Sequence, residues 1–284
     1  MGLSPSGHKA MPVRLLRLFI LALIILAARG AIGADPMESV PTGKEIFQRC
    51  NYKYPGEDQQ STLTIILRDK DGNERKNVYH RLWKDYKGAE SIVDKMVLYT
   101  EFPPDAEGAA FMRWAYSAAS DKNADQWIYL PVLKKIRRVA IRDPGDSFLG
   151  SDLTYADIST RDIDADEHKL TQVLKRGDQE FFAVESTPHN GKRSLYSKTI
   201  SWFEKGQDWM GCVKRQVDYY DNKGIPLKQQ LIKWQQVAKA WVWSEVLVKN
   251  LQTGHSSLFR ITDVKINVGL PDDAFTERAL TLNQ

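Results

Sequence analysis

The chain has 284 residues, of which 42% are hydrophobic and 27% are charged, and its formal net charge is +4 at pH 7. This length accommodates one large domain or two small ones. The first 33 residues hold four of the 40 basic residues and none of the 36 acidic ones, so the remainder is neutral, and we expect no nucleic acid among its partners.

Residues 1–33 have the pattern of a cleaved secretory signal peptide. Arg14 and Arg17 form a positive region, 18–28 is an unbroken apolar run, and Ala31-Ile32-Gly33 is a small-x-small cleavage site. The apolar run is short for a bilayer span, and an uncleaved anchor is the alternative. We therefore expect export and, because no composition break divides 34–284, a single domain over those residues.

The predicted elements begin with a short helix over about 42–50, where Thr42 and Glu45 form a capping box. Apolar residues then alternate over 63–67 and 78–83, and Asp71-Gly72 between them predicts a hairpin. Polar residues 51–60 are expected to form a loop. The further expected strands are 95–102, 109–117, 127–130, 135–141, 169–174, 181–187, 199–204, 213–220, 227–237, 241–251 and 258–268.

Two more short helices are expected, near 153–158 and over 271–276. A run of short strands with so few helices predicts an all-β sheet of about a dozen strands that curls or packs on itself. A curved sheet with few helices leaves a concave apolar face, which must be filled by side chains or by a ligand. The eight tryptophans are mostly flanked by alternating polar residues, which places them on sheet faces; ordinary core packing is the simpler interpretation of each.

Cys50 and Cys212 are the only cysteines, and two states are open for them, a disulfide or two buried free thiols. Neither belongs to a metal-spaced cluster and the histidines are scattered, so we expect no metal and no cofactor. Four aspartates lack EF-hand spacing and are expected to serve turns and caps: Asp143, Asp146, Asp152 and Asp157.

A catalytic triad is disfavoured because the chain has no G-x-S-x-G elbow or similar motif. The residues that could form one on paper are Ser147, Ser151, His168 and Asp162. We therefore expect no enzyme.

A basic run has two interpretations: an edge strand blunted by charge, or a docking site for anionic head groups or an acidic partner. It comprises Lys134, Lys135, Arg137 and Arg138, with Arg142 beyond.

The middle of the chain resembles the signature run of the outer membrane lipoprotein-sorting protein family, relatives of the periplasmic carrier LolA. The motifs that carry the resemblance are Gln126-Trp127-Ile128-Tyr129-Leu130-Pro131, Lys135-Ile136-Arg137-Arg138, Asp146-Ser147-Phe148-Leu149-Gly150-Ser151-Asp152 and Tyr155-Ala156-Asp157. Further likeness at 43–46, 249–255 and 270–280 extends it over nearly the whole mature chain. Cys50, Cys212 and the segment 52–55 depart from the family pattern.

The resemblance implies an unclosed antiparallel β-barrel (a half-barrel) with short helices or loops covering its concave mouth, and no catalytic residues. It implies a periplasmic carrier that binds a lipid or lipoprotein acyl chain in a hydrophobic cavity and shuttles it between the inner and outer membranes. The implied partners are an inner-membrane RND-type transporter and a transiently contacted membrane surface. The alternative is an accessory or sensor subunit of an envelope lipid exporter that carries no cargo.

On this interpretation we predict a lipid-binding wall, a gate loop and a basic docking strip. The gate is Phe148, Leu149 and Tyr155, with Gly150 allowing motion, and the docking strip is the basic run. The wall, which rests on assumed strand faces, is Phe111, Trp114, Trp127, Tyr129, Trp202 and Trp234.

Overall fold

The computed structural model describes residues 1–2, 40–120, 122–139, 143–159, 161–190 and 194–281. The chain divides into two units, 1–40 and 41–284, and all the helices and strands named below belong to the second unit. The expected signal peptide with its cleavage site, the end of the strand expected over 135–141, and Arg142 lie outside the described residues. Within the described part, no helix combines the length and apolar character needed to cross a membrane.

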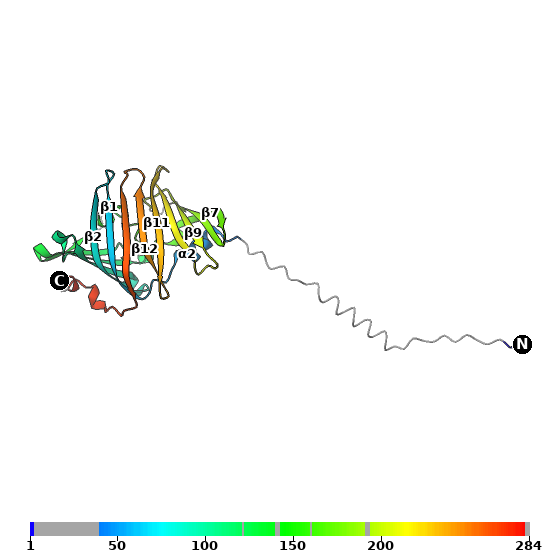
Figure 1. The fold of residues 1–284 in the computed structure, drawn as a ribbon, viewed down its shortest axis with the longest axis horizontal. Helices are drawn as coiled ribbons and strands as arrows, with labels where there is room; N and C mark the ends of the chain where they lie inside the picture. The colour runs from blue at the N-terminus through cyan, green and yellow to red at the C-terminus, as the bar shows by residue number, and fades with distance from the viewer. Residues whose placement is uncertain (3–39, 121, 140–142, 160, 191–193, 282–284) are drawn as a thin grey trace. The chain divides into compact units, whose positions relative to one another are not determined.

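One antiparallel sheet of 13 strands forms the body of the described residues (Figure 1). β1 (Asp58–Arg68) pairs with β13 (Ser256–Ile266) in its middle, and β6 (Lys135–Val139) and β7 (Asp166–Arg176) are its two edges. The strands between them are β2 (Glu74–Asp85), β3 (Ile92–Phe102), β4 (Ala110–Tyr116), β5 (Asp125–Leu130), β8 (Gln179–Pro188), β9 (Lys198–Lys205), β10 (Val213–Tyr220), β11 (Pro226–Val237), β12 (Ala240–Asn250). The predicted fold, an open antiparallel half-barrel of about a dozen strands, is confirmed.

The strand order has one consequence for the chain between the edges. β1 to β6 run outward from the middle in sequence order, and β7 to β13 return from the opposite edge. The segment that joins β6 to β7 must therefore pass from one edge of the sheet to the other. We call its longer described part, residues 143–159, the crossing segment.

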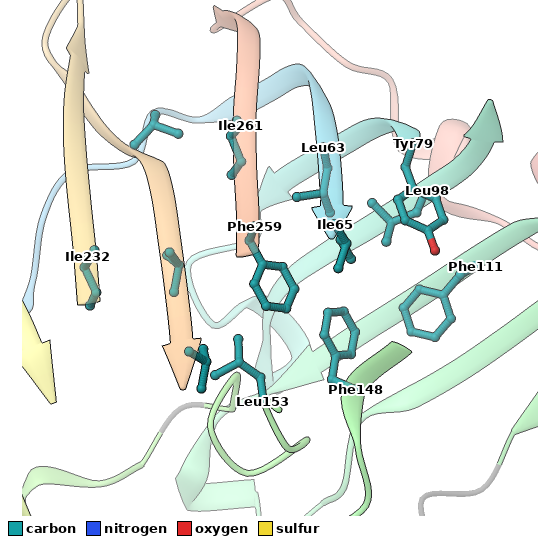
Figure 2. Packing of buried hydrophobic residues seen from close by; sticks show 13 residues of the cluster. Leu63, Ile65, Tyr79, Leu98, Phe111, Phe148, Leu153, Ile232, Phe259 and Ile261 are labelled. Carbon is teal, nitrogen blue, oxygen red and sulfur yellow. The ribbon is translucent and has the colours of Figure 1, made fainter. Parts of the chain in front are cut away.

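The crossing segment lies against the concave face of the sheet. Figure 2 shows Phe148 and Leu153 pointing toward side chains from the middle of the sheet, among them Ile65 and Phe259. Phe148 is 5% and Leu153 is 2% exposed. The apolar core of this face thus includes side chains of the connection itself.

The opposite face of β2–β5 is covered by the C-terminal segment 270–281. Phe275 and Leu280 pack there against Val97 and Met112, which alternate with residues of the concave face. The chain turns onto this face where the Asp58 carboxylate accepts the N–H groups of residues 268, 269 and 270 at 2.7–3.0 Å. The helix expected over 271–276 is a 3₁₀ turn, Asp272–Phe275.

Two other expectations about local structure are wrong. β1 begins at Asp58 inside the expected loop, because Asp58 and Gln59 are buried polar residues whose side chains bond the turns beside them. No helix forms over 153–158, because the N–H groups of Tyr155 and Ala156 bond across the loop to residues 146 and 144.

Short 3₁₀ turns lie between the strands at Ala89–Ser91, Pro104–Ala106, Ala118–Ser120, Pro131–Leu133, Phe148–Gly150 and Ile163–Ala165, and a further one, Ala279–Thr281, lies in the C-terminal segment.

The helix α2 (Gly43–Asn51) is the one α-helix of the described residues, and its predicted capping box is present, with Glu45 N–H donating to Thr42 Oγ1. Ile46 and Cys50 face the buried cluster of β8 and β9. A Cβ on Gly43 would lie 2.6 Å from the backbone of His168 on β7, so only glycine allows this close approach. Cys50 and Cys212 form a disulfide that fastens the helix beside β10.

The variant C50A/C212A is expected to lose about 2–5 kcal/mol of unfolding free energy, because the cross-link closes a loop of 162 residues in the unfolded chain. Urea unfolding followed by circular dichroism measures this. Wild-type protein unfolded in the presence of a reductant is the matched control, and its urea midpoint should approach that of the variant. Equal midpoints for oxidised protein and variant would contradict the expected stabilisation.

Candidate functional site

The crossing segment folds back on itself through its own hydrogen bonds. Phe148 N–H donates to the Leu153 carbonyl at 2.8 Å, and Ser147 Oγ and Ser151 Oγ donate to carbonyls of the same loop. Leu149 and Gly150 adopt the left-handed conformation, with φ of 52° and 73°. This tight loop presents Phe148 and Leu153 to the sheet as an apolar pair.

The predicted gate residues come together on the concave face. The Phe148 ring meets Phe111 of β4 edge-on with centroids 5.9 Å apart, and meets Tyr155 at 5.8 Å. Leu149 packs against the same cluster, and Gly150 lies beside Leu67 of β1. The position suits a gate, and the gating motion itself stays a prediction.

A buried ion pair fastens the crossing segment to β11. Lys228 Nζ lies 2.5 Å from the Asp157 carboxylate, with side chains only 3% and 1% exposed, and it also donates to the Asp152 carbonyl at 2.9 Å. The Tyr196 hydroxyl donates to the other Asp157 oxygen at 2.7 Å. Burial and the Asp157 charge together raise the pKa of Tyr196 well above its ordinary value.

Two further contacts hold the segment at β13 and β4. The Asp152 carboxylate accepts a hydrogen bond from the Ser257 hydroxyl at 2.6 Å, and the Asp152 backbone N–H donates to Ser257 Oγ at 2.9 Å. Arg113 of β4 donates to the Ile158 carbonyl at 3.1 Å and pairs with Asp94 at 3.3 Å. Burial raises the pKa of Asp94, and Arg113 opposes that rise. Buried charges thus fix a loop whose core contacts are apolar.

A cavity of about 400 Å³ lies between the crossing segment, α2 and the concave side of β8–β12. Its size is that of a small-molecule site. Its apolar lining comes from Leu153, Ile158, Val217, Ile232, Trp234 and Trp243. A second cavity, of about 580 Å³, shares Ala156, Ser159, Arg161, Ser194 and Tyr196 with it and reaches Tyr116 and Lys122 on the β4–β5 side. Together they line both flanks of the crossing segment.

The predicted wall residues are divided between the two faces of the sheet. Phe111 and Trp234 lie on the concave face, and Trp234 lines the cavity. Trp114, Trp127 and Tyr129 lie on the opposite face under the C-terminal segment, where Trp114 Nε1 donates to the Phe275 carbonyl.

Trp202 also lies away from the cavity. Its Nε1 donates to Asp218, while its neighbour Ser201 lines the cavity. The face assumed for Trp114, Trp127, Tyr129 and Trp202 is therefore corrected, because side chains alternate along a strand and a shift of one residue reverses the face.

The predicted basic residues are exposed on the edge strand and the turn before it. Arg138 pairs with Asp125, whereas Lys134, Lys135 and Arg137 have no ion pair among the described residues. Val132 in the same turn is 88% exposed. The edge-strand interpretation is confirmed, and docking stays a prediction.

The residues that could form a triad on paper bond other groups in the structure. The ring nitrogens of His168 contact Ser186 Oγ and the Ile163 carbonyl at 2.7 and 2.9 Å, and Ser147 and Ser151 bond their own loop. Asp143 and Asp157 accept N–H groups of their own turns, as predicted. Within the described residues, no group of three His, Cys, Asp or Glu side chains could hold a metal.

Sequence reasoning missed the residues that anchor the crossing segment and one cation in the cavity wall. Asp152 and Asp157 were assigned to turns alone, because nothing in the sequence pairs them with Ser257 and Lys228. Lys214 lines the cavity, although strand alternation places it with the outward Gln216.

A family model with the description "Uncharacterized protein" matches residues 93–282, more than half of the chain. The chain belongs to this family. No curated protein matches the sequence.

Solved structures share the fold of the chain. An outer membrane lipoprotein-sorting protein domain from Vibrio parahaemolyticus is 26% identical with a TM-score of 0.68, covering 84% of this chain and 98% of its own. A DUF1329 family protein from Desulfovibrio piger is 22% identical, with a TM-score of 0.72 and coverage of 84% and 97%. A LolA superfamily protein from Nitrosomonas europaea is 17% identical, with a TM-score of 0.59 and coverage of 84% and 100%. The resemblance to LolA-like proteins is thus confirmed.

The variant K228M is expected to lose about 3–5 kcal/mol of unfolding free energy, because it leaves the Asp157 carboxylate buried without its cation. The double variant K228M/D157L removes both charges and should recover most of that loss. Chemical denaturation of the single and double variants measures the difference. K233M, which breaks the exposed pair with Glu245, is the control and should cost no more than about 1 kcal/mol. Equal losses in the single and double variants would argue against a coupled pair.

Proposed function

We propose that the protein is an exported, non-enzymatic carrier that holds an acyl chain of a lipid or lipoprotein on the concave face of its sheet. The crossing segment is the gate over that face. The observation that carries the proposal is the position of Phe148 and Leu153. These side chains occupy the apolar floor of the half-barrel beside an existing cavity.

The chemistry of the crossing segment supports an exchange between loop and lipid. Phe148, Leu153 and Tyr155 make apolar contacts that an acyl chain can replace, since these contacts have no directional requirement. Burying a chain contributes roughly 0.8 kcal/mol per CH₂ group. Several methylene groups therefore offset the loss of the loop contacts, and the cavity gives the chain a place to begin.

The fold likeness to a lipoprotein-sorting domain supports the cargo class, and the signal-like residues 1–33 support export to the periplasm. A carrier between two membranes must take its cargo from one partner and deliver it to another. We therefore propose an inner-membrane RND-type transporter as donor and brief contact with membrane surfaces through the basic strip.

Locking the crossing segment to the sheet is expected to stop cargo exchange. In D152C/S257C the new cysteines face each other across a close backbone approach, since Asp152 N–H lies 2.9 Å from Ser257 Oγ, and this suits a disulfide. Oxidised protein should take up a fluorescent phospholipid from vesicles far more slowly than the same protein under mild reduction.

The single variant S257C is the matched control and should show no dependence on the redox state. Both proteins carry C50A/C212A as well, so that a change in redox state acts on the new bond alone. Equal uptake rates for locked and unlocked protein would contradict the gate. No uptake in any state would contradict the carrier proposal.

The variant K134Q/K135Q/R137Q is expected to bind anionic vesicles more weakly by about fivefold for each charge removed, since a basic residue near such a surface contributes about 1 kcal/mol. Vesicle sedimentation with phosphatidylglycerol measures this. R138Q is the matched control with a smaller effect, because Arg138 already pairs with Asp125. Unchanged vesicle binding by the triple variant would contradict membrane contact through the basic strip.

A further inference from the structure

Lys214 points into the cavity because β10 contains a bulge. Strict alternation back from Val217 and Tyr219, which line the cavity, places Lys214 on the outer side of the sheet. The register of β10 against β9 shifts between Lys214 and Gln216, so one extra residue is inserted there. Arg215 and Gln216 bond the outer residues Glu204 and Asp218, and the side chain of Lys214 is turned inward.

Lys214 lies beside two aromatic rings. Its Nζ lies 5.0 Å from the ring centroid of Phe47 on α2 and 5.8 Å from that of Phe203 on β9. Its carbonyl accepts Trp234 Nε1 from β11 at 2.7 Å, which fixes the backbone at the bulge. Burial lowers the pKa of Lys214 to about 8.

The other charged and titratable groups around this cavity have partners, whereas the ammonium group of Lys214 has no hydrogen bond or ion pair among the described residues. Asp157 pairs with Lys228, Asp166 with Arg161 at 2.6 Å, and Glu185 with Lys198 at 2.7 Å. His168 contacts Ser186 and a carbonyl, and the Tyr196 and Tyr219 hydroxyls donate to Asp157 and Gln230. The cavity therefore holds one ammonium group without an anion.

We infer that Lys214 is the counter-ion for an anionic lipid head group, carboxylate or phosphate, and that the carrier selects anionic over neutral lipids. The inference rests on the proposed lipid-carrier function and names the chemistry of its cargo. The free protein keeps a buried cation without an anionic partner, at a cost in stability. A bound carboxylate or phosphate removes that cost by accepting charge-assisted hydrogen bonds from the ammonium group. The chain of the same lipid lies on the apolar lining that Trp234 and Trp243 share.

Two lipids with the same chain test the inference, oleate and the neutral oleyl alcohol. Trp234 and Trp243 line the cavity, so tryptophan fluorescence reports binding. At pH 7 wild-type protein is expected to bind oleate about 10- to 100-fold more tightly than oleyl alcohol, the range for one hydrogen bond to a charged group. In K214M the two affinities should become equal through loss of oleate binding. Oleoyl lysophosphatidic acid in place of oleate shows whether phosphate serves as well as carboxylate.

Two variants control the titration. Lys249 is an exposed lysine of β12, and K249M should keep the wild-type preference. K214R keeps a positive charge at all relevant pH values and should also retain the preference for oleate. Raising the pH from 7 to 9 should weaken oleate binding by wild-type protein, because the free ammonium group loses its proton near pH 8, and should leave K214R unaffected.

The stability of the free protein shows that K214M folds and that the cation is unpaired. Folded Lys214 has a lower pKa than the ordinary 10.5 of the unfolded chain, so the stability of wild-type protein rises between about pH 8 and 10.5. K214M should therefore unfold at a higher temperature than wild type at pH 7, and the difference should shrink toward pH 10.

The outcomes separate the inference from the function on which it rests. Equal binding of oleate and oleyl alcohol by wild-type protein overturns the role of Lys214 and leaves the carrier function standing. An unchanged preference in K214M overturns it as well. Failure of every lipid to bind wild-type protein contradicts the carrier function itself.

Discussion

The connection between the two edge strands is the constraint on which the structure depends. A sheet whose chain leaves the middle in one direction and returns from the opposite edge needs one long passage from β6 to β7. The structure routes it over the concave face, where Phe148 and Leu153 supply the core that a second sheet or helices supply in other folds. The same route places the crossing segment over an apolar floor.

The crossing segment is held by two kinds of interaction with different consequences. The apolar contacts of Phe148 and Leu153 can be exchanged for other apolar groups at little cost, because they have no directional requirement. The anchors at Lys228, Ser257 and Arg113 are directional and buried, and they fix the loop in one position. A gate needs both, an exchangeable filling and a defined closed state.

Electrostatics divides the site in a similar way. Around the first cavity, acids and bases are neutralised in pairs, and the single unpaired cation is Lys214 among the described residues. Its inward direction comes from a bulge in the backbone rather than from its place in a polar pattern. On the proposed function, the bulge is the local feature from which the preference for an anionic lipid arises, because the other charged groups around the cavity are paired.

Much of the fold could be predicted from the sequence, because the signals for its elements lie between residues that are close in the sequence. Alternating apolar residues, the Asp71-Gly72 turn and the capping box at Thr42 and Glu45 depend on near neighbours alone, and the structure contains them. Sheet faces depend on register, so Trp202 was assigned to the wrong face. Long-range partners have no signal in one sequence. For this reason the Cys50–Cys212 bond was left open between two states, and the Asp157–Lys228 pair was missed.

Native mass spectrometry of the protein recovered from its own cell envelope, followed by lipid extraction, tests the central claim most directly. The carrier account predicts a defined added mass that leaves with organic solvent and is a lipid with an acyl chain. A measured mass equal to that of the polypeptide without a ligand, together with failure to bind any of a series of added lipids, would contradict the carrier account.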